Sequence, residues 1–196
     1  MESTDRSLID AHMSGDKTAF GDLVRRYGDN VLGYLTSLCG DREQAEDLFQ
    51  ETFARVHKKA HTIRGSKFRS WLYTIATRLA IDGFRRRTRL SAVSLNQKPD
   101  CCGENCEESG AVAVAENPHD PSEEVIRTEQ KEQVRQALES LPTMQRATLV
   151  LAYYQGFTYR EVAGVLGCSL GAVKTHMYRA LATLAQRLPD VAGEVT

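Results

Sequence analysis

Residues 157–184 hold the side chains whose types and spacing point most directly to a chemical role. Their sequence, FTYREVAGVLGCSLGAVKTHMYRALATL, predicts two short helices joined by a tight turn. Thr158 and Glu161 have the spacing of a capping box, which starts the first helix. Gly167 supplies the left-handed residue that the turn requires, and Ser169 caps the second helix. A helix pair of this kind can place its second helix in the major groove of DNA.

The two faces of the second predicted helix differ in composition. One apolar stripe at helical spacing consists of Val173, Met177, Ala180 and Leu184. The outer face instead offers cations and hydrogen-bonding groups, namely Lys174, Thr175, Tyr178 and Arg179. On spacing alone, an ordinary helical hairpin in a bundle remains an alternative. The charge balance favours nucleic acid, because residues 158–188 contain four basic residues and one acid.

Charge along the chain is distributed unevenly. The 196 residues carry a net charge of −1, which by itself does not indicate a nucleic-acid binder. Residues 78–89, however, contain five arginines and one acid, Asp82, whereas residues 98–132 contain ten acids and three basic residues. Two basic zones therefore flank an acidic middle, and this asymmetry is more informative than the total.

Composition also limits the class of protein. An apolar fraction of 41% suits compact cores, and the length allows one or two domains. No apolar run is long enough to span a membrane, and the first residues lack the pattern of a signal peptide, so we expect a cytoplasmic protein without membrane insertion. No nucleophile, base and orienting group occur together as a set, so we expect neither an enzyme nor a cofactor.

The apolar pattern predicts an all-α fold with two helical domains. Residues 7–90 form the first domain, with helices at 42–59 and 67–87. Residues 91–121 are rich in proline, glycine and acids and lack periodicity, which predicts a flexible linker. Helical patterns resume at 122–140 and 143–154 and continue into the helix pair, so that 122–188 forms the second domain.

Three motifs, in this order, resemble the extracytoplasmic-function (ECF) sigma factors of the sigma-70 family, promoter-recognition subunits of bacterial RNA polymerase. The motifs are AEDLFQETFARV (45–56), FRSWLYTIATRLAIDGFRRR (68–87) and LPTMQRATLVLAYYQGFTYREVAGVLGCSLGAVKTHMYRAL (141–181). The resemblance implies a first domain for the −10 element of the promoter and a second for the −35 element. It also implies RNA polymerase core and promoter DNA as partners, and leaves open an anti-sigma protein as a further one.

The resemblance assigns two surfaces to the first domain. Asp47, Gln50 and Glu51 correspond to the face that docks on the clamp helices of the largest polymerase subunit. The expected −10 contacts are Arg64, Lys67, Arg69, Arg78, Asp82, Arg85 and Arg86. Residues 61–69 resemble the loop that holds a flipped base, with His61 and Ser66 as further candidates. Asp82 could orient Arg78 or Arg85, and Arg78 replaces an asparagine that is usual in the family. Trp71 lies in the apolar stripe, which favours core packing over base stacking.

In the second domain, the expected −35 contacts lie on the second helix of the pair and at the start of the first. Leu170, Gly171, Lys174, Thr175 and Tyr178 are expected at the DNA, whereas Arg160 and Arg179 are expected to bind its backbone. Gly171 permits a close approach and leaves amide groups for a phosphate. His176 is expected to be partly exposed and structural.

The remaining candidates concern metal or redox chemistry. Cys101, Cys102 and Cys106, with His119, could provide ligands for a metal, but their spacing matches no standard zinc signature, so no metal is expected. Cys39 and Cys168 are expected to be small buried residues. Two alternatives to a sigma factor follow. One is a decoy that sequesters an anti-sigma factor, and the other is a variant that senses redox state or metal through the linker cysteines.

Overall fold

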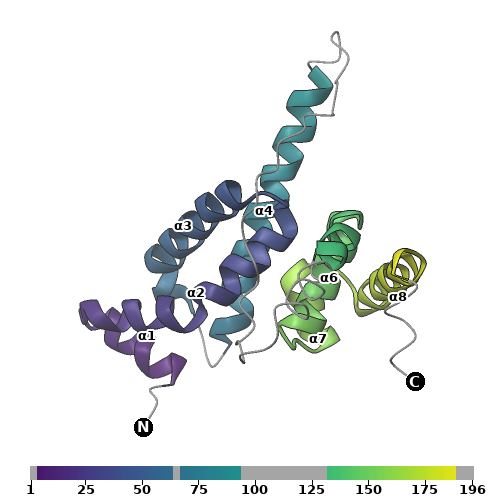
Figure 1. Ribbon diagram of the computed structural model, residues 1–196. Helices are drawn as coiled ribbons and strands as arrows, with labels where there is room; N and C mark the ends of the chain where they lie inside the picture. Colours follow the sequence, from purple (N-terminus) through teal and green to yellow (C-terminus); the bar gives the residue numbers. More distant parts are fainter. Residues whose placement is uncertain (1–3, 64–66, 94–131, 189–196) are drawn as a thin grey trace, which may run out of the picture.

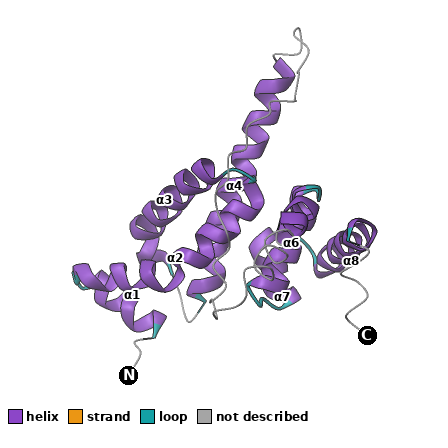
Figure 2. Cartoon of the chain, in the orientation of Figure 1, coloured by secondary structure: helices purple, strands orange, loops and turns teal. Residues whose placement is uncertain are grey.

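The computed structural model describes residues 4–63, 67–93 and 132–188, with side chains described up to Arg86 in the second of these segments. Within these segments every regular element is a helix, as the sequence predicts (Figure 2). None of the described helices combines the length and apolar character needed to cross a bilayer. We call residues 4–93 the first module and residues 132–188 the second module.

The first module consists of α1 (Asp5–Met13), α2 (Lys17–Cys39), α3 (Arg42–Lys59), a short 3-10 helix η1 (Ala60–Thr62) and α4 (Phe68–Val93). Short polar side chains start the helices. Asp16 accepts the Thr18 amide at the start of α2, and Asp41 accepts the Glu43 amide at the start of α3. The bounds of α3 agree with the helix predicted at 42–59.

Apolar side chains of α2, α3 and α4 form the core of the first module, and polar contacts also join its helices. The hydroxyl groups of Tyr34 on α2 and Thr77 on α4 lie 2.7 Å apart in the interior. At the other end, Asp5 of α1 accepts hydrogen bonds from Tyr27 and Arg26 of α2, at 2.5 and 2.6 Å. These ties hold α1 against α2 and α2 against α4.

Helix α4 is longer than the sequence analysis predicts. The predicted end near Arg87 is wrong by six residues, because the helix continues to Val93. Arginine, leucine and alanine favour helix, and no proline or glycine follows Gly83 before Pro99. The C-terminal half of α4 therefore projects beyond the helices packed around its first half (Figure 1).

The second module contains a helix at 132–139, α6 (Thr143–Leu149), a π-helical turn η2 (Val150–Tyr154), α7 (Tyr159–Leu166) and α8 (Leu170–Arg187). The single helix predicted at 143–154 therefore changes type after Leu149. Of the helix predicted at 122–140, only the part from residue 132 lies among the described residues.

The two modules are in contact, with α7 beside the first half of α4 (Figure 1). Their apolar cores form one continuous cluster that includes Phe68 and Tyr73 of α4 and Phe157, Val162 and Val165 of the second module. This contact is not evident from the sequence pattern, and it determines which predicted site residues are accessible.

Candidate nucleic-acid and polymerase interfaces

The turn between α7 and α8 has the geometry that the sequence predicts. The Thr158 amide donates to the Glu161 carboxylate at 2.8 Å, and the Glu161 amide donates back to the Thr158 hydroxyl at 3.4 Å, which completes the capping box. Gly167 ends α7 with φ +66°, and Ser169 caps α8 by accepting the Ala172 amide at 3.1 Å. Three residues thus turn the chain between two short helices, as in a helix-turn-helix unit.

Helix α8 has one buried and one exposed face. Val173, Met177 and Ala180 are buried against α6 and α7. The predicted DNA contacts on α8 are all exposed, including Tyr178 with 76% of its surface accessible and Leu170 with 37%. The exposed set is Leu170, Gly171, Lys174, Thr175, Tyr178 and Arg179, and Arg160 is exposed near the start of α7. His176 is half-buried, as expected.

Gly171 lies in the first turn of α8, where helix amides are not used by the helix itself. A Cβ atom added there would meet only the Ser169 hydroxyl, at 3.8 Å. The fold therefore does not require glycine at this position, which leaves the close approach of a ligand as a reason for it.

A second basic surface lies on α4. Arg78, Asp82, Arg85 and Arg86 are exposed, and they follow one another at spacings of four, three and one along the helix. Among the described side chains, no ion pair joins Asp82 to Arg78 or Arg85, so the structure does not show the orienting contact predicted for Asp82. Among the side chains that the structure describes, none forms an ion pair with these arginines, an arrangement that suits phosphate groups.

The N-terminal end of α4 faces the second module. Lys67 is exposed, whereas Arg69 is half-buried, and its guanidinium donates to the backbone carbonyl of Gln155. The same guanidinium lies 4.4 Å from the centroid of the Phe157 ring. Trp71 packs partly buried against the core, 6.2 Å from the Phe68 ring, as predicted. His61 is exposed, and Arg64 and Ser66 lie outside the described residues.

The predicted docking face of α3 is an exposed polar strip. Asp47, Gln50 and Glu51 are exposed at spacings of three and one. Glu51 accepts two hydrogen bonds from Arg55, at 2.6 and 3.0 Å, so that part of its charge is already paired. The opposite face of α3 is held in the core by Ala45, Phe53 and Val56.

The residues that join the two modules were not predicted from the sequence. The Tyr73 hydroxyl donates to the Gln155 side-chain oxygen at 2.5 Å, and the rings of Tyr73 and Phe157 lie 5.2 Å apart. Burial raises the pKa of Tyr73 well above its ordinary value, so the phenol keeps its proton. A tyrosine in an apolar stripe, which needs a partner for its hydroxyl, was the available signal.

The cysteines divide into two groups. Cys39 and Cys168 are half-buried, so both are less deeply buried than expected. Partial burial raises the pKa of the Cys168 thiol. Cys101, Cys102, Cys106 and His119 lie outside the described residues. In the part of the chain that the structure describes, no three potential metal ligands cluster together.

Comparison with known proteins matches both modules to one family. Residues 23–90 match Sigma-70 region 2, and residues 131–184 match Sigma-70, region 4. The chain is 32% identical to the ECF RNA polymerase sigma factor SigE of Mycolicibacterium smegmatis, over 98% of this chain and 71% of that protein. It is 32% identical to the ECF RNA polymerase sigma-E factor of Salmonella typhimurium, over 90% of both chains.

Solved structures with a similar fold are also known. CnrH, solved in complex with the cytosolic domain of CnrY, aligns with a TM-score of 0.65 at 26% identity, covering 95% of this chain and 98% of CnrH. The sigma factor RpoE of Bartonella quintana, solved with the anti-sigma factor NepR, aligns with a TM-score of 0.67 at 24% identity, covering 87% of this chain and 97% of RpoE.

Proposed function

The chain belongs to the ECF sigma factors of the sigma-70 family, and on this premise we propose a division of its promoter-directing function among named residues. As a sigma factor it has RNA polymerase core and promoter DNA as partners. In our proposal the first module binds core through α3 and contacts the −10 element through α4, and α8 of the second module binds the −35 element. The protein then acts in the cytoplasm, where polymerase and chromosome meet.

The observation that carries this proposal is the exposed face of α8. The exposed face of α8 carries Lys174, Thr175 and Tyr178, and its opposite face is packed in a core. The packing of that buried face holds the helix that carries these three side chains. Side chains of these types can donate to base edges in the major groove. In the proposal Arg160 and Arg179, which are both exposed, neutralise phosphates of the DNA backbone.

The basic face of α4 supports the assignment of the −10 element. Opening a base pair and holding the base outside the stack costs a few kcal/mol, which contacts to the separated strand must offset. Arg78, Arg85 and Arg86 provide cations along one helix for such contacts, and Lys67 lies at its N-terminal end. Arg78 adds a charge where the family usually has asparagine.

The docking face on α3 provides the link to polymerase. Asp47, Gln50 and Glu51 form an acidic and amide strip, which complements a basic coiled coil such as the clamp helices. We expect Asp47→Lys with Glu51→Lys to abolish co-purification with core. Asp29→Lys, which reverses an exposed acid on α2, serves as the matched control. Retention of core by the α3 variant would contradict the docking assignment.

Transcription with core polymerase over a library of randomised promoters tests the DNA assignment. Lys174→Ala should change the preferred −35 sequence. It should lower the discrimination against the wrong base at the affected base pair by about 1–3 kcal/mol. Arg179→Ala should weaken all promoters equally and lower the salt slope of binding by about 0.9. Arg6→Ala, which removes an exposed ion pair with Asp10 on α1, should change neither. An unchanged −35 preference in Lys174→Ala would refute the assignment of α8.

The decoy alternative is less favoured by the same surfaces. A protein that only sequesters an anti-sigma factor needs no cations on its DNA faces, yet Arg85, Arg86, Lys174 and Arg179 are all exposed. An anti-sigma partner of this chain remains a proposal. Affinity capture with the full chain as bait, followed by transcription in the presence of the captured protein, would test it.

A further inference from the structure

Two imidazole rings meet where the end of α1 lies against the end of α3. His12 belongs to the last turn of α1, and His57 belongs to the last turn of α3. The centroids of the two rings are 4.8 Å apart. Neither residue belongs to the interfaces proposed above for DNA or for polymerase, so the pair is not explained by them.

A phenylalanine of α2 supports both imidazoles from the interior. The ring centroid of Phe20 lies 5.1 Å from that of His12 and 5.0 Å from that of His57. Phe20 is itself anchored in the core, with its ring centroid 6.4 Å from that of the buried Phe53. On the other side His57 is exposed and His12 is half-buried. The pair is therefore held in place from within and is accessible to an ion from solvent.

The ring nitrogens of the pair are not engaged by other side chains. Among the described residues, neither His12 nor His57 takes part in a side-chain hydrogen bond or an ion pair. Burial lowers the pKa of His12, and the neighbouring His57 lowers it further. The His12 ring is therefore mostly uncharged at neutral pH, with an electron pair on one nitrogen. Two imidazoles in contact repel one another once both are protonated, a cost that apolar side chains in the same place would not have.

The separation of the rings suits two imidazoles that share one metal ion. A metal–nitrogen bond of about 2.0–2.1 Å places the ion about 3.2 Å from the centroid of each ring. Two rings bound at a right angle would then have centroids about 4.5 Å apart, and at the tetrahedral angle about 5.2 Å. The 4.8 Å between the centroids of His12 and His57 lies within this range.

The donor atoms determine the class of ion. Imidazole nitrogen suits Zn²⁺, Ni²⁺ and Cu²⁺, whereas Mg²⁺ and Ca²⁺ prefer oxygen ligands. In the described part of the chain no third potential ligand joins the pair, so water would fill the other coordination positions. Such a site is open and exchanges its ion, unlike a structural site with four protein ligands.

We propose that His12 and His57 together bind one divalent ion of the Zn²⁺ class, with water as the remaining ligand, and that this ion joins the end of α1 to α3. The start of α1 is already held, because Asp5 accepts hydrogen bonds from Tyr27 and Arg26 of α2. The ion fixes the opposite end of the same helix.

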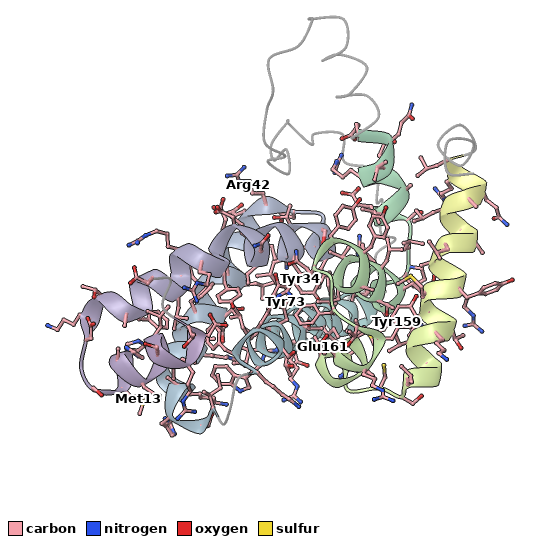
Figure 3. The ribbon with its side chains drawn as sticks, turned by 90° about the horizontal axis from the view of Figure 1, so that it is seen from below. Met13, Tyr34, Arg42, Tyr73, Tyr159 and Glu161 are labelled. Atoms are coloured by element: carbon pink, nitrogen blue, oxygen red, sulfur yellow. The ribbon has the colours of Figure 1, made fainter. Side chains whose placement is uncertain are left out.

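The site lies away from the second module. Figure 3 shows Met13, which follows His12, at one end of the molecule, and Tyr159 and Glu161 of the second module toward the other end. The inference goes beyond the proposed function and does not depend on it.

Calorimetric titration with Zn²⁺ tests the ligands. The full chain is used with Cys101, Cys102 and Cys106 replaced by serine, so that thiolates of the 91–121 segment do not contribute. This parent protein should bind one equivalent of Zn²⁺. His12→Ala and His57→Ala should each weaken binding by about tenfold or more, because each removes one of two protein ligands. His61→Ala is the matched control, since His61 is exposed on η1 and lies outside the pair, and it should bind Zn²⁺ as the parent does.

Hydrogen–deuterium exchange tests whether the ion joins the two helices. At a Zn²⁺ concentration 100 times the measured Kd, the amides of α1 should exchange more slowly, by up to about 100-fold where their exchange requires α1 to leave α3. The amides of α8 should exchange at the same rate with and without Zn²⁺. In His57→Ala, whose exposed side chain is not part of the core, the slowing in α1 should disappear.

Three results would overturn the proposal. The parent protein could fail to bind Zn²⁺, His57→Ala could bind it as tightly as the parent, or Zn²⁺ could bind without slowing exchange in α1. None of these results bears on the proposed function, which fails if wild-type protein with core polymerase does not select promoters.

Discussion

The buried hydrogen bond between Tyr34 and Thr77 allows a quantitative prediction, because its donor can be assigned. Both residues are almost fully buried, and their hydroxyl oxygens lie 2.7 Å apart. The Thr77 hydroxyl also donates to the Tyr73 carbonyl at 2.7 Å. A threonine hydroxyl has a single hydrogen, so the Tyr34 hydroxyl must be the donor in the shared bond.

The two single substitutions should therefore have unequal effects on stability. Thr77→Val leaves the Tyr34 hydroxyl buried without an acceptor and should lower the free energy of unfolding by about 2–3 kcal/mol. Tyr34→Phe leaves a threonine whose hydrogen is still bonded to Tyr73, and should lower it by about 1 kcal/mol. In the double variant, Tyr34→Phe with Thr77→Val, no buried hydroxyl is left without an acceptor. It should therefore be more stable than Thr77→Val alone.

Urea denaturation followed by far-UV circular dichroism measures these differences. Each kcal/mol should also lower the melting temperature by about 2–4 °C in a chain of this size. Thr52→Val is the matched control, since Thr52 is equally buried but its hydroxyl donates only to the Leu48 carbonyl of its own helix. The reasoning is refuted if Tyr34→Phe destabilises the protein as much as Thr77→Val, or if the double variant is the least stable of the three.

Two further predictions concern the helix pair. Gly171→Ala should fold normally and gain up to about 1 kcal/mol of helix stability, because the added methyl group meets only Ser169. A loss of −35-dependent transcription without a loss of melting temperature would show that DNA approaches this position closely. Unchanged transcription would contradict that close approach. Hydrogen bonds from Thr158 lower the pKa of Glu161, and the positive charges of Arg69 and Lys67 add to this effect. The ionised Glu161 therefore stabilises the fold above its ordinary pKa, and this contribution is lost as pH falls through the lowered value. The stability difference between wild type and Glu161→Gln should accordingly shrink on acidification, and a difference that grows would reverse the sign of the argument.

The local structure of the helix pair could be predicted from the sequence because single residues determine it. Thr158 with Glu161, Gly167 and Ser169 each satisfy a local backbone requirement, and the structure confirms all of them. The bounds of α3 follow for the same reason, since Asp41 caps its start. Caps and turns involve neighbours in sequence, so one chain is sufficient to recognise them.

The end of α4 and the contact between modules could not be predicted in this way. Residues 88–93 lack an apolar stripe, and helix propensity alone does not distinguish a continued helix from the start of a linker there. The π-helical turn before Gln155 contacts α2, which is distant in the chain, so its local sequence alone did not predict it. Arg69 was predicted as a DNA contact from the resemblance of residues 61–69 to a family loop, and its protein partners come from residues more than eighty positions away.

The net charge of −1 acquires a physical meaning once these surfaces are placed. Acids on α3 and in the 98–132 segment balance the cations of α4 and α8, so the free chain has little overall attraction for DNA. Binding without sequence preference depends on the number of phosphates neutralised, and a nearly neutral protein that also occupies Arg69 internally neutralises few. If core polymerase covers the acidic strip, as proposed, the strip no longer offsets the cations of α4 and α8. The salt dependence of DNA binding should therefore be steeper for the complex with polymerase than for the free chain, and equal slopes would show that the cations are already available in the free protein.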